Sequence, residues 1–507
     1  AEEKEKEQEK EKEKESNLFG RKWMSMQAIT AGNNKTFGAT KPWGSTIGVT
    51  GTHVYRQSSY HSISQRLPLN QFLLDGVFDG DQEVMPGDTT HHLVNDRKLL
   101  VVMVGLPARG KSYTSLKLCR YLNWVGCKAQ EFNFKLYREK HMKGFQTHHF
   151  FKDDNYEAVR QRDDLMKMAL QDGLKFLQHG GRVAILDGTN VTMRRRRNIR
   201  EFSESFASDK FSLKLCFLEL KCDDEAVLKR NMTAIVEAPN YSTELTKEQA
   251  LDDLQQRINH YSDRYEEVGM CDYDKSYIKV IDVGRKIITN RISGFVLSRI
   301  LCFIMNLHSI PRPIYLCRHG ESEYNVNERL GGDPHLSDKG RLYSQRLSKF
   351  VHKQLDVEDL NVWTSTMKRT IETSLYIRDK CAQFVKWKVL DEIDVGICDG
   401  MTYAEIEHTY KDEFEERKKD KLRYRYPRGE SYEDVVKRVE PVIMEIERSR
   451  RPLLIICHRA VLRCLYAYLT NTDKAEMPLL DIPLHTVFKI SPNAYGTEVE
   501  KFPVDMS

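Results

Sequence analysis

Lys98-Leu-Leu-Val-Val-Met-Val-Gly-Leu-Pro-Ala-Arg-Gly-Lys-Ser112 decides the fold of the first half of the chain. An apolar run of strand length leads directly into G-x-x-x-x-G-K-[ST], and a helical pattern follows. Such a loop points its backbone N–H groups at phosphate oxygens, and the helix N-terminus adds its dipole. We predict a phosphate-binding loop, in which Lys111 reaches the outer phosphates and Ser112 is a Mg²⁺ ligand; the alternative is a glycine turn that binds nothing. The loop residues are Gly105, Leu106, Pro107, Ala108, Arg109, Gly110, Lys111 and Ser112.

A second apolar run, 182–187, ends in the carboxylate of Asp187. Beside a phosphate loop, this group is suited to contact Mg²⁺ or to serve as a base near an acceptor hydroxyl. The alternative is a simple cap at the end of a strand. The basic run 194–197 follows, and we expect it to supply cations to the acceptor site, with one or two of its arginines facing water.

Apolar runs alternate with helical patterns along both halves of the chain, which predicts α/β architecture with mostly parallel sheets. In the first half we expect strands at 98–104, 182–186, 213–220 and 277–281 and helices near 111–123, 163–178 and 246–266. In the second half we expect strands at 313–317, 361–363 and 452–457. A helical stretch and two prolines separate the halves, so the predicted parts are an arm (1–95) and two domains (96–310 and 311–507).

The predicted arm opens with a Lys/Glu repeat over 1–16 and continues without apolar periodicity, which is typical of disorder. Arg56 lies three residues before Ser59, a spacing that a basophilic protein kinase could use; the alternative is a polar linker. The whole chain has 507 residues and a net charge of only +5, which does not indicate nucleic-acid binding. With no apolar run of the ~20 residues that a membrane helix needs and no paired cysteine motif, we expect a soluble cytoplasmic protein.

The second half carries a different anion-binding pattern. Arg318-His319-Gly320 follows a predicted strand, which places an imidazole beside a guanidinium at the carboxyl edge of the sheet. A neutral imidazole nitrogen can attack phosphorus, and the phosphohistidine needs cations around it. Three distant pieces are candidates to converge on His319, although either histidine alone could be a core residue. They are Lys368-Arg-Thr370, Asp391-Glu-Ile-Asp394 and Cys457-His-Arg459.

Both motifs in tandem resemble the bifunctional 6-phosphofructo-2-kinase/fructose-2,6-bisphosphatase family. The resemblance runs from about Leu99 to Tyr495 and includes the phosphate loop, Leu316–Glu323 and Arg423–Asp434. It implies a P-loop kinase domain followed by a histidine phosphatase (phosphoglycerate mutase-like) domain. Such a protein makes fructose 2,6-bisphosphate from fructose 6-phosphate and ATP and hydrolyses it back, which regulates glycolysis. It also implies a homodimer.

For the kinase half, the resemblance implies ATP with Mg²⁺ as cofactor, held by Lys111, Ser112 and Asp187. Cys222 and Asn231 match family positions at the active and nucleotide sites. The residues that would grip fructose 6-phosphate are Arg138, Arg162, Thr189, Arg195, Arg257 and Tyr261.

For the phosphatase half, the resemblance implies no cofactor, with His319 as the nucleophile and Glu392 as the proton donor. The residues that would hold the transferred phosphoryl group are Arg318, Asn325, Arg369 and His458. The residues that would hold the sugar and its other phosphate are Gly331, Tyr403, Arg417, Lys421, Tyr432 and Arg463.

The chain departs from the family pattern at two positions. A lysine usual in the nucleotide region is replaced within Ala234-Ile-Val236, with Lys229 or a lysine of 134–140 as candidate substitutes. Arg459 stands where glutamine is usual after the second histidine, which adds charge near the bisphosphate. Two alternatives therefore remain: a fructose-2,6-bisphosphatase with a degenerate, ATP-binding kinase domain, and a scaffold whose pockets bind without turnover.

Overall fold

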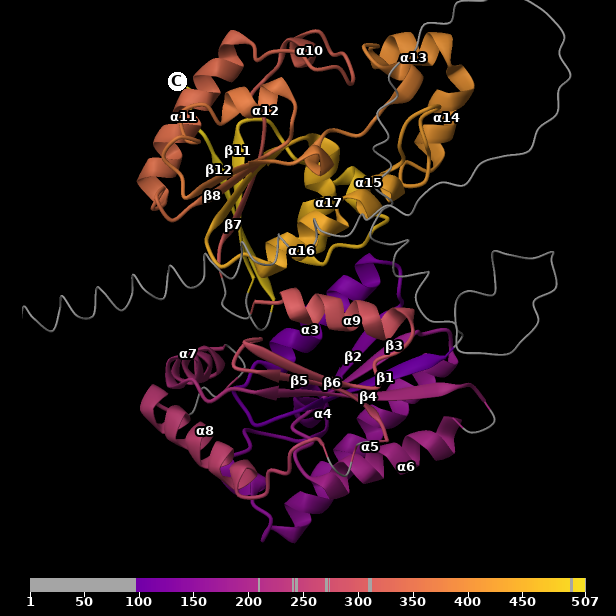
Figure 1. Cartoon of the computed structure of the whole chain (residues 1–507), viewed down its shortest axis with the longest axis vertical. Coiled ribbons are helices and arrows are strands. Elements are labelled where there is room, and N and C mark those ends of the chain that lie inside the picture. The colour runs from indigo at the N-terminus through magenta and orange to yellow at the C-terminus, as the bar shows by residue number, and fades with distance from the viewer. Residues whose placement is uncertain are drawn as a thin grey trace, which may run out of the picture. The chain divides into compact units, whose positions relative to one another are not determined.

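The computed structural model describes residues 97–207, 210–238, 241, 245–269, 272, 274–308, 312–492 and 496–506. These residues belong to one compact unit and build two six-stranded sheets (Figure 1). The predicted arm, with Arg56 and Ser59, lies outside the described residues.

The first sheet has the order β2-β3-β1-β4-β5-β6, and all neighbouring strands are parallel except the antiparallel pair β5 and β6. Its strands are β1 (Lys98–Val104), β2 (Ala129–Asn133), β3 (Val183–Asp187), β4 (Leu213–Lys221), β5 (Ser276–Ile281) and β6 (Lys286–Asn290). Its helices are α3 (Lys111–Trp124), α4 (Phe134–His141), η1 (His148–Phe151), α5 (Tyr156–Gln178), α6 (Met193–Ala207), α7 (Glu225–Val236), α8 (Lys247–Ser262) and α9 (Phe295–Asn306).

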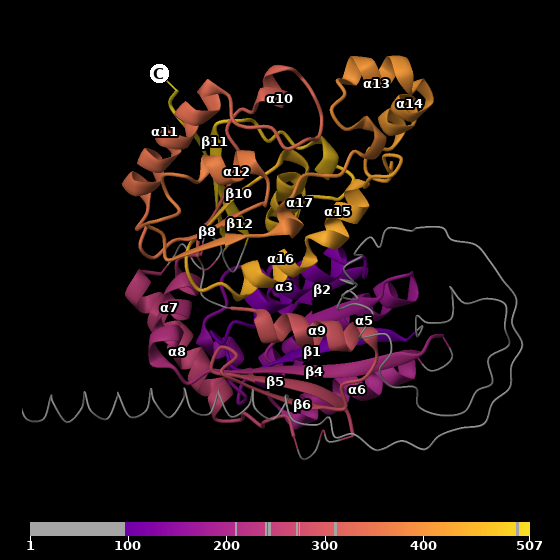
Figure 2. The ribbon, with the colours of Figure 1, turned by 45° about the horizontal axis from the view of Figure 1, so that its top comes forward.

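Strand β1 explains why helices cover both faces of this sheet. Successive side chains of a strand point to opposite faces, and every β1 residue after Lys98 is buried. Leu99, Val101 and Met103 belong to the cluster that contains α3 and α9. Leu100, Val102 and Val104 pack with residues of α5 and with Ile199 of α6 on the other face. Figures 1 and 2 show α3 and α9 on one side of the sheet and α5 and α6 on the other.

The second sheet has the order β12-β11-β7-β10-β8-β9, in which β11 pairs antiparallel with both β7 and β12. Its strands are β7 (Ile314–Arg318), β8 (Asn361–Thr364), β9 (Gln383–Lys386), β10 (Leu453–Cys457), β11 (Thr486–Pro492) and β12 (Thr497–Pro503). Its helices are α10 (Glu323–Val326), α11 (Asp338–Gln354), α12 (Lys368–Thr373), η3 (Lys388–Leu390), η4 (Gly396–Cys398), α13 (Tyr403–Thr409), α14 (Lys411–Lys419), α15 (Tyr432–Arg438), α16 (Glu440–Arg448), α17 (Arg459–Thr470) and η5 (Met477–Leu479).

One hydrophobic cluster joins the two sheets through their helices. It includes Tyr121 and Phe303 of α3 and α9 as well as Ile443 and Tyr468 of α16 and α17. A buried ion pair lies in the same contact: the Lys117 amino group donates to both Glu447 carboxylate oxygens at 2.9 Å, and the Tyr468 hydroxyl donates to Glu447 Oε1 at 2.8 Å. Such a pair is stable only when its remaining hydrogen bonds are made, as they are here.

The predicted α/β class with mostly parallel sheets is confirmed, and all the predicted strands are present with ends that shift by at most one residue. The prediction missed β2, β6, β9, β11 and β12, which lie toward the edges of their sheets and carry alternating or short apolar patterns. Helix α5 begins seven residues before the predicted start, because Asn155 caps it by accepting a hydrogen bond from Ala158 N. Helix α8 ends at Ser262, four residues early.

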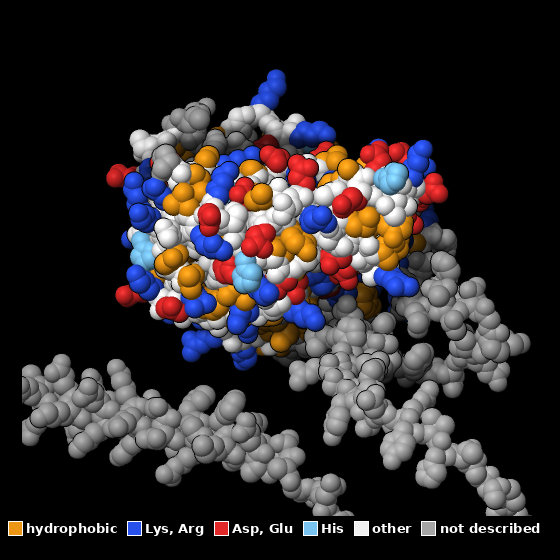
Figure 3. Space-filling model, turned by 90° about the horizontal axis from the view of Figure 1, so that it is seen from above, with side chains coloured by type: hydrophobic (Ala, Val, Ile, Leu, Met, Phe, Trp, Pro, Cys, Tyr) orange, Lys and Arg blue, Asp and Glu red, His pale blue; other side chains and the backbone are white. Residues whose placement is uncertain are grey.

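Acidic and basic side chains are interspersed on the face shown in Figure 3. Among the described residues, none of the helices is long and apolar enough to cross a membrane.

Candidate functional site

The first site lies at the carboxyl end of β1, where the loop before α3 has a backbone that requires glycine. Gly105 has φ 138°, and a Cβ there would lie 2.4 Å from the Leu220 carbonyl oxygen. Gly105 N donates to Thr189 O at 2.9 Å, which ties the loop to the segment after β3. Gly110, with φ 81°, precedes the first residue of α3. The loop therefore has the geometry of an anion cradle at a helix N-terminus.

Lys111, Ser112 and Asp187 converge at this loop. The Lys111 amino group donates to Leu106 O at 2.6 Å, and burial lowers its pKa to about 8 while Asp187 acts in the opposite direction. Ser112 Oγ donates to Asp187 Oδ2 at 2.6 Å. A hydroxyl and a carboxylate at this distance are oxygen donors of the kind that Mg²⁺ prefers, so these residues fit the metal.

Two polar residues that the sequence analysis missed hold Asp187 in place. Asn133 Nδ2 donates to Asp187 Oδ2 at 2.7 Å and to Glu131 Oε1 at 3.4 Å, and the Ser115 hydroxyl also donates to Glu131. Burial, and then the charge of Asp187, raise the pKa of Glu131 to about 7. The sequence pattern of β2 was too weak to predict a strand here, because only two of its five residues are buried.

A cavity of about 40 Å³ beside the loop is lined by Arg109, Cys222, Val227 and Asn231, among others. Asn231 Nδ2 donates to Ala108 O at 3.0 Å, which fixes α7 against the loop. Burial raises the pKa of the Cys222 thiol, so this thiol lines the cavity in its neutral form. The cavity therefore lies beside the loop that is predicted to hold the phosphates of a nucleotide.

Val236, at the position where the family usually has a lysine, and the two candidate substitute lysines lie in different environments. Val236 packs with Ala108 and Leu254 in an apolar cluster, so the substitution leaves no buried polar group behind. Lys229, on the same helix, is exposed. Lys135 of the 134–140 segment has its pKa lowered by burial and by Arg138 and Arg257, against the effect of Glu139, so its amino group lies within electrostatic reach of two predicted sugar-phosphate residues.

The predicted fructose 6-phosphate residues gather around Phe150 and Phe151 of η1. The Arg257 and Arg138 guanidinium carbons lie 3.8 and 5.2 Å from the centre of the Phe151 ring, and Tyr261 packs against the same ring. Burial, and then Arg257, lower the pKa of Arg138 to about 10. These cations are close enough to oppose one another, which a bound anion would relieve.

The basic run 194–197 divides by role. Arg195 pairs with Asp163 and donates to Arg162 O at 3.0 Å, which brings it to the other sugar-phosphate candidates. Arg196 is only 1% exposed and pairs with Asp272 at 3.0 Å, so it is structural. The two flanking arginines are exposed, as expected for part of the run.

The second site brings His319 and His458 together after β7 and β10, with ring centres 5.2 Å apart. His319 Nδ1 lies 2.7 Å from Gly320 O, and since a carbonyl only accepts, Nδ1 carries the proton and Nε2 has the free lone pair. Burial, followed by Arg369 and Arg318, lowers the pKa of His319 well below its usual value. The imidazole is therefore neutral and suited to nucleophilic attack.

His458 is fully buried, and its Nε2 lies 2.8 Å from the Ser365 hydroxyl, a partner that the sequence analysis missed. Burial, and then Arg369 and His319, lower its pKa well below the usual value. His458 Nδ1 is buried without a hydrogen-bond partner among the described residues.

Arginines and a glutamate surround the two histidines. Arg369 donates to Gly332 O at 2.8 Å and Arg318 to Ile482 O at 3.1 Å, so backbone carbonyls fix both guanidinium groups. Burial lowers the pKa of Arg318 to about 10, although Glu392 opposes this. Glu392 accepts hydrogen bonds from Arg459 N at 3.1 Å and Ala460 N at 3.2 Å, at the start of α17.

Most of the remaining candidates form a cationic rim next to this centre. Arg463 donates to the Tyr432 hydroxyl at 3.0 Å and to Leu480 O at 2.6 Å. Arg417 donates to the Tyr403 hydroxyl at 3.2 Å. Burial, followed by the charges of Arg463, Arg417 and Arg459, lowers the pKa of Lys421 to about 8.

Two further candidates belong to the loop after His319. Asn325 Oδ1 accepts from Ser322 N at 3.1 Å in a capping box, which leaves its NH₂ group as the available donor. Gly331 has φ 70°, and a Cβ there would overlap Asp399 Oδ1, so this position requires glycine. The loop also carries Gly332, whose carbonyl holds Arg369.

Comparison with known proteins identifies the family of the chain. The model of the 6-phosphofructo-2-kinase family matches residues 86–311, and that of the histidine phosphatase superfamily (branch 1) matches residues 314–505. The rat 6-phosphofructo-2-kinase/fructose-2,6-bisphosphatase 3 is 46% identical over 405 residues, which cover 79% of this chain and 71% of that protein. The rat 6-phosphofructo-2-kinase/fructose-2,6-bisphosphatase 4 is 47% identical over 404 residues, which cover 79% of this chain and 84% of that protein.

Among solved structures, Bacillus stearothermophilus YhfR is 28% identical with a TM-score of 0.33 and covers 37% of this chain and 95% of its own. A putative alpha-ribazole-5'-P phosphatase from Escherichia coli is 19% identical with a TM-score of 0.35 and covers 38% of this chain and 95% of its own.

Proposed function

Because the chain belongs to the 6-phosphofructo-2-kinase/fructose-2,6-bisphosphatase family, we propose that it makes and destroys one signalling sugar, fructose 2,6-bisphosphate, at two separate sites. The observation that carries the proposal is the neutral His319 imidazole, with Nε2 free, between two buried guanidinium groups, in the same chain as a phosphate loop.

In the kinase half, the loop amides and Lys111 bind the phosphates of ATP, and the cavity near Asn231 holds its base. Ser112 and Asp187 would hold Mg²⁺, which when bound neutralises charge on the transferred phosphoryl group. Arg138, Arg257 and the other members of the set around Phe151 orient fructose 6-phosphate so that its 2-hydroxyl faces the outer phosphate. Most of the rate then comes from this positioning and from fixed charges.

In the phosphatase half, His319 Nε2 attacks the 2-phosphate of fructose 2,6-bisphosphate. The N–P bond forms as the P–O bond to the sugar breaks, and Glu392 gives its proton to the departing oxygen. Water then attacks the phosphorus of the phosphohistidine and gives a proton to Glu392. The N–P bond breaks, which releases phosphate and restores the neutral His319. Arg318, Arg369 and His458 stabilise the negative charge at each step, and the rim with Lys421 and Arg463 holds the sugar and its 6-phosphate.

The decisive experiment measures both reactions on one preparation. Phosphorus label should pass from the γ position of ATP to fructose 6-phosphate. Quenching in alkaline denaturant during hydrolysis of fructose 2,6-bisphosphate labelled in its 2-phosphate should trap label on His319. ATP binding without transfer would instead support the degenerate kinase, which the family membership does not favour. Binding at both sites with neither reaction would support the scaffold.

From the family we expect a homodimer and no cofactor in the phosphatase half. From the sequence we expect domains at 96–310 and 311–507 after an arm at 1–95, and a cytoplasmic location. Because Arg56 lies three residues before Ser59, we also expect a regulatory protein kinase to act on Ser59 or a neighbouring residue of the arm. Light scattering tests the dimer, and unchanged rates in Ser59→Asp would remove the regulatory site.

A further inference from the structure

Three arginines without acidic partners meet where the two halves of the chain join. Arg230 lies on α7, Arg312 precedes β7, and Arg450 lies between α16 and β10. Among the described residues, none of the three has a hydrogen bond or an ion pair. Arg312 is only 8% exposed, and Arg230 buries both Nε and one terminal nitrogen without a partner. An unpaired buried guanidinium costs several kcal/mol, so this arrangement calls for an explanation.

Backbone contacts bring these three segments together. His308 N donates to Glu447 O at 3.0 Å and Leu453 N to Pro313 O at 3.4 Å, so the segment around Arg312 lies along the end of α16 and the start of β10. On the other side, Leu307 shares a cavity with Val227 and Asn231, which flank Arg230 on α7. His308 lies among all three, because Arg312, Arg450 and Arg230 each contribute to lowering its pKa, after the larger effect of burial.

The carboxylate that acts on Arg312 is already occupied. Glu447 accepts hydrogen bonds from Lys117 and Tyr468. No other carboxylate among the described residues raises the pKa of Arg312. The junction therefore has more positive charge than its own carboxylates balance.

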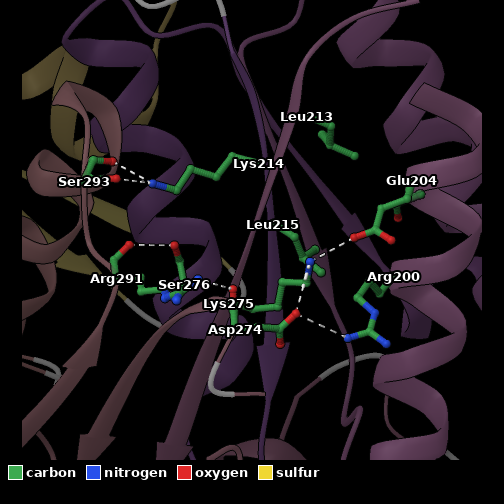
Figure 4. A pocket seen from close by; sticks show the side chains of 11 residues that line it. Arg200, Glu204, Leu213, Lys214, Leu215, Asp274, Lys275, Ser276, Arg291 and Ser293 are labelled. Atoms are coloured by element: carbon green, nitrogen blue, oxygen red, sulfur yellow. Dashed lines mark hydrogen bonds and ion pairs between the residues drawn. The ribbon is translucent and has the colours of Figure 1, made fainter. Parts of the chain in front are cut away.

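A second charged cavity, of about 280 Å³, shows the opposite situation (Figure 4). Its cations have partners: Lys275 pairs with Glu204 at 3.1 Å and with Asp274 at 3.5 Å, and Lys214 donates to Ser293 Oγ at 2.7 Å. The chain thus satisfies its cations in that cavity and leaves them unsatisfied at the junction.

We propose that Arg230, Arg312 and Arg450 form a binding site for a small phosphate-type dianion at the junction of the two halves, separate from both catalytic sites. Guanidinium groups bind phosphate oxygens in pairs of hydrogen bonds, and three of them match a dianion better than a single carboxylate. Arg450, which is exposed, lies at the entrance, and Arg312 forms the base. Because Arg230 precedes Asn231, which bonds to the phosphate loop, occupancy of this site would reach the nucleotide site through α7.

The test is hydrogen exchange of the full chain with and without inorganic phosphate at constant ionic strength. We expect phosphate to protect amides of 303–308 and 312–316. Arg450→Ala should raise the phosphate concentration for half protection about tenfold, as expected for one lost charge-assisted contact. Arg230→Ala should do the same. Arg451→Ala is the matched control, because the neighbouring Arg451 is also exposed but pairs with Asp359 at 3.2 Å.

Protection of the loop at 105–112 and of the segment after His319 serves as an internal reference in every variant, because phosphate also binds there. Glycerol phosphate in place of inorganic phosphate distinguishes a monoester from the free ion as the ligand, and protection by either supports the site. Absence of protection at 303–316 in the wild type, equal protection by chloride, or equal losses in Arg450→Ala and Arg451→Ala would overturn the proposal.

Discussion

The two catalytic sites hold phosphate by different means. In the first half, a glycine loop and the buried Lys111 lie beside Asp187, whose carboxylate accepts a hydrogen bond from Ser112 and would hold a metal with it in the proposed mechanism. In the second half, the cations are guanidinium groups that backbone carbonyls hold in place, around two neutral histidines. The difference teaches that a phosphoryl group needs fixed positive charge, and that either a metal or anchored arginines can supply it.

The largest expected difference between the two sites comes from the variant His319→Ala. It removes the atom that accepts the phosphoryl group, so we expect the phosphatase kcat to fall by up to about 10⁶-fold, as when a covalent nucleophile is lost. The kinase rate should stay within about twofold, as expected for an independent distant site. Both rates and the protein-bound label, which should be stable in alkali and labile in acid, are measured on the same preparation, and a variant that still traps label would contradict the assigned nucleophile.

Removal of divalent metal should abolish most of the kinase activity and leave the phosphatase activity intact, without a mutation. With a chelator in excess, we expect the kinase rate to fall about 10³-fold, since metal contributes several kcal/mol to phosphoryl transfer. Hydrolysis of fructose 2,6-bisphosphate should be unchanged, because Arg318 and Arg369 supply the charge. Restoration of the kinase by added Mg²⁺ is the control, and an equal loss of hydrolysis would show that the second site also needs metal.

A third experiment tests the contact that the two halves share. Lys117→Met leaves Glu447 buried without its cation, and we expect the free energy of unfolding to fall by about 3–5 kcal/mol. The double variant Lys117→Met/Glu447→Met removes both charges and should recover most of the loss. Denaturant unfolding measures both variants. If the single variant is as stable as the wild type, the pair does not hold the halves together.

The smallest expected effect concerns Lys421 in the phosphatase rim. Its pKa of about 8 means that the side chain is charged below that pH and loses its charge above it. We expect the KM for fructose 2,6-bisphosphate to rise about tenfold as the pH passes from 7 to 9, as for one lost charged contact. Lys421→Arg stays charged and should flatten this rise, whereas an unchanged profile would assign the pH dependence to another group.

The sequence was sufficient for the central strands and for the residues that follow them. β1, β3, β7 and β10 are almost wholly apolar because both faces are covered, and the motifs at their carboxyl ends are continuous in sequence. Glu131 and Ser365 could not be predicted in the same way. Each makes a contact with a residue more than 15 positions away, which only the folded chain creates.

Arg196 shows a different limit of the sequence. Four consecutive arginines gave no sign of which one is buried, because helix α6 itself was not predicted. The position of each arginine on α6 determines which one is buried, since Arg196 faces Asp272 whereas its immediate neighbours point elsewhere. The resemblance named Arg195 and Arg162 for the same site, and the two are in contact, but the structural role of Arg196 came only from the fold.

The helix that begins at Lys111 also carries Lys117 and Arg120, whose amino and guanidinium groups end on Glu447 and on the Leu469 carbonyl oxygen at 2.8 Å. A protein engineer who cuts the gene near residue 310 would therefore free a hydrophobic helix face with two uncompensated cations on it. The excised kinase fragment should be prone to aggregation when expressed alone, and co-expression with the excised phosphatase fragment should restore solubility. We therefore expect the two halves to behave as one folding unit, even though they catalyse two different reactions.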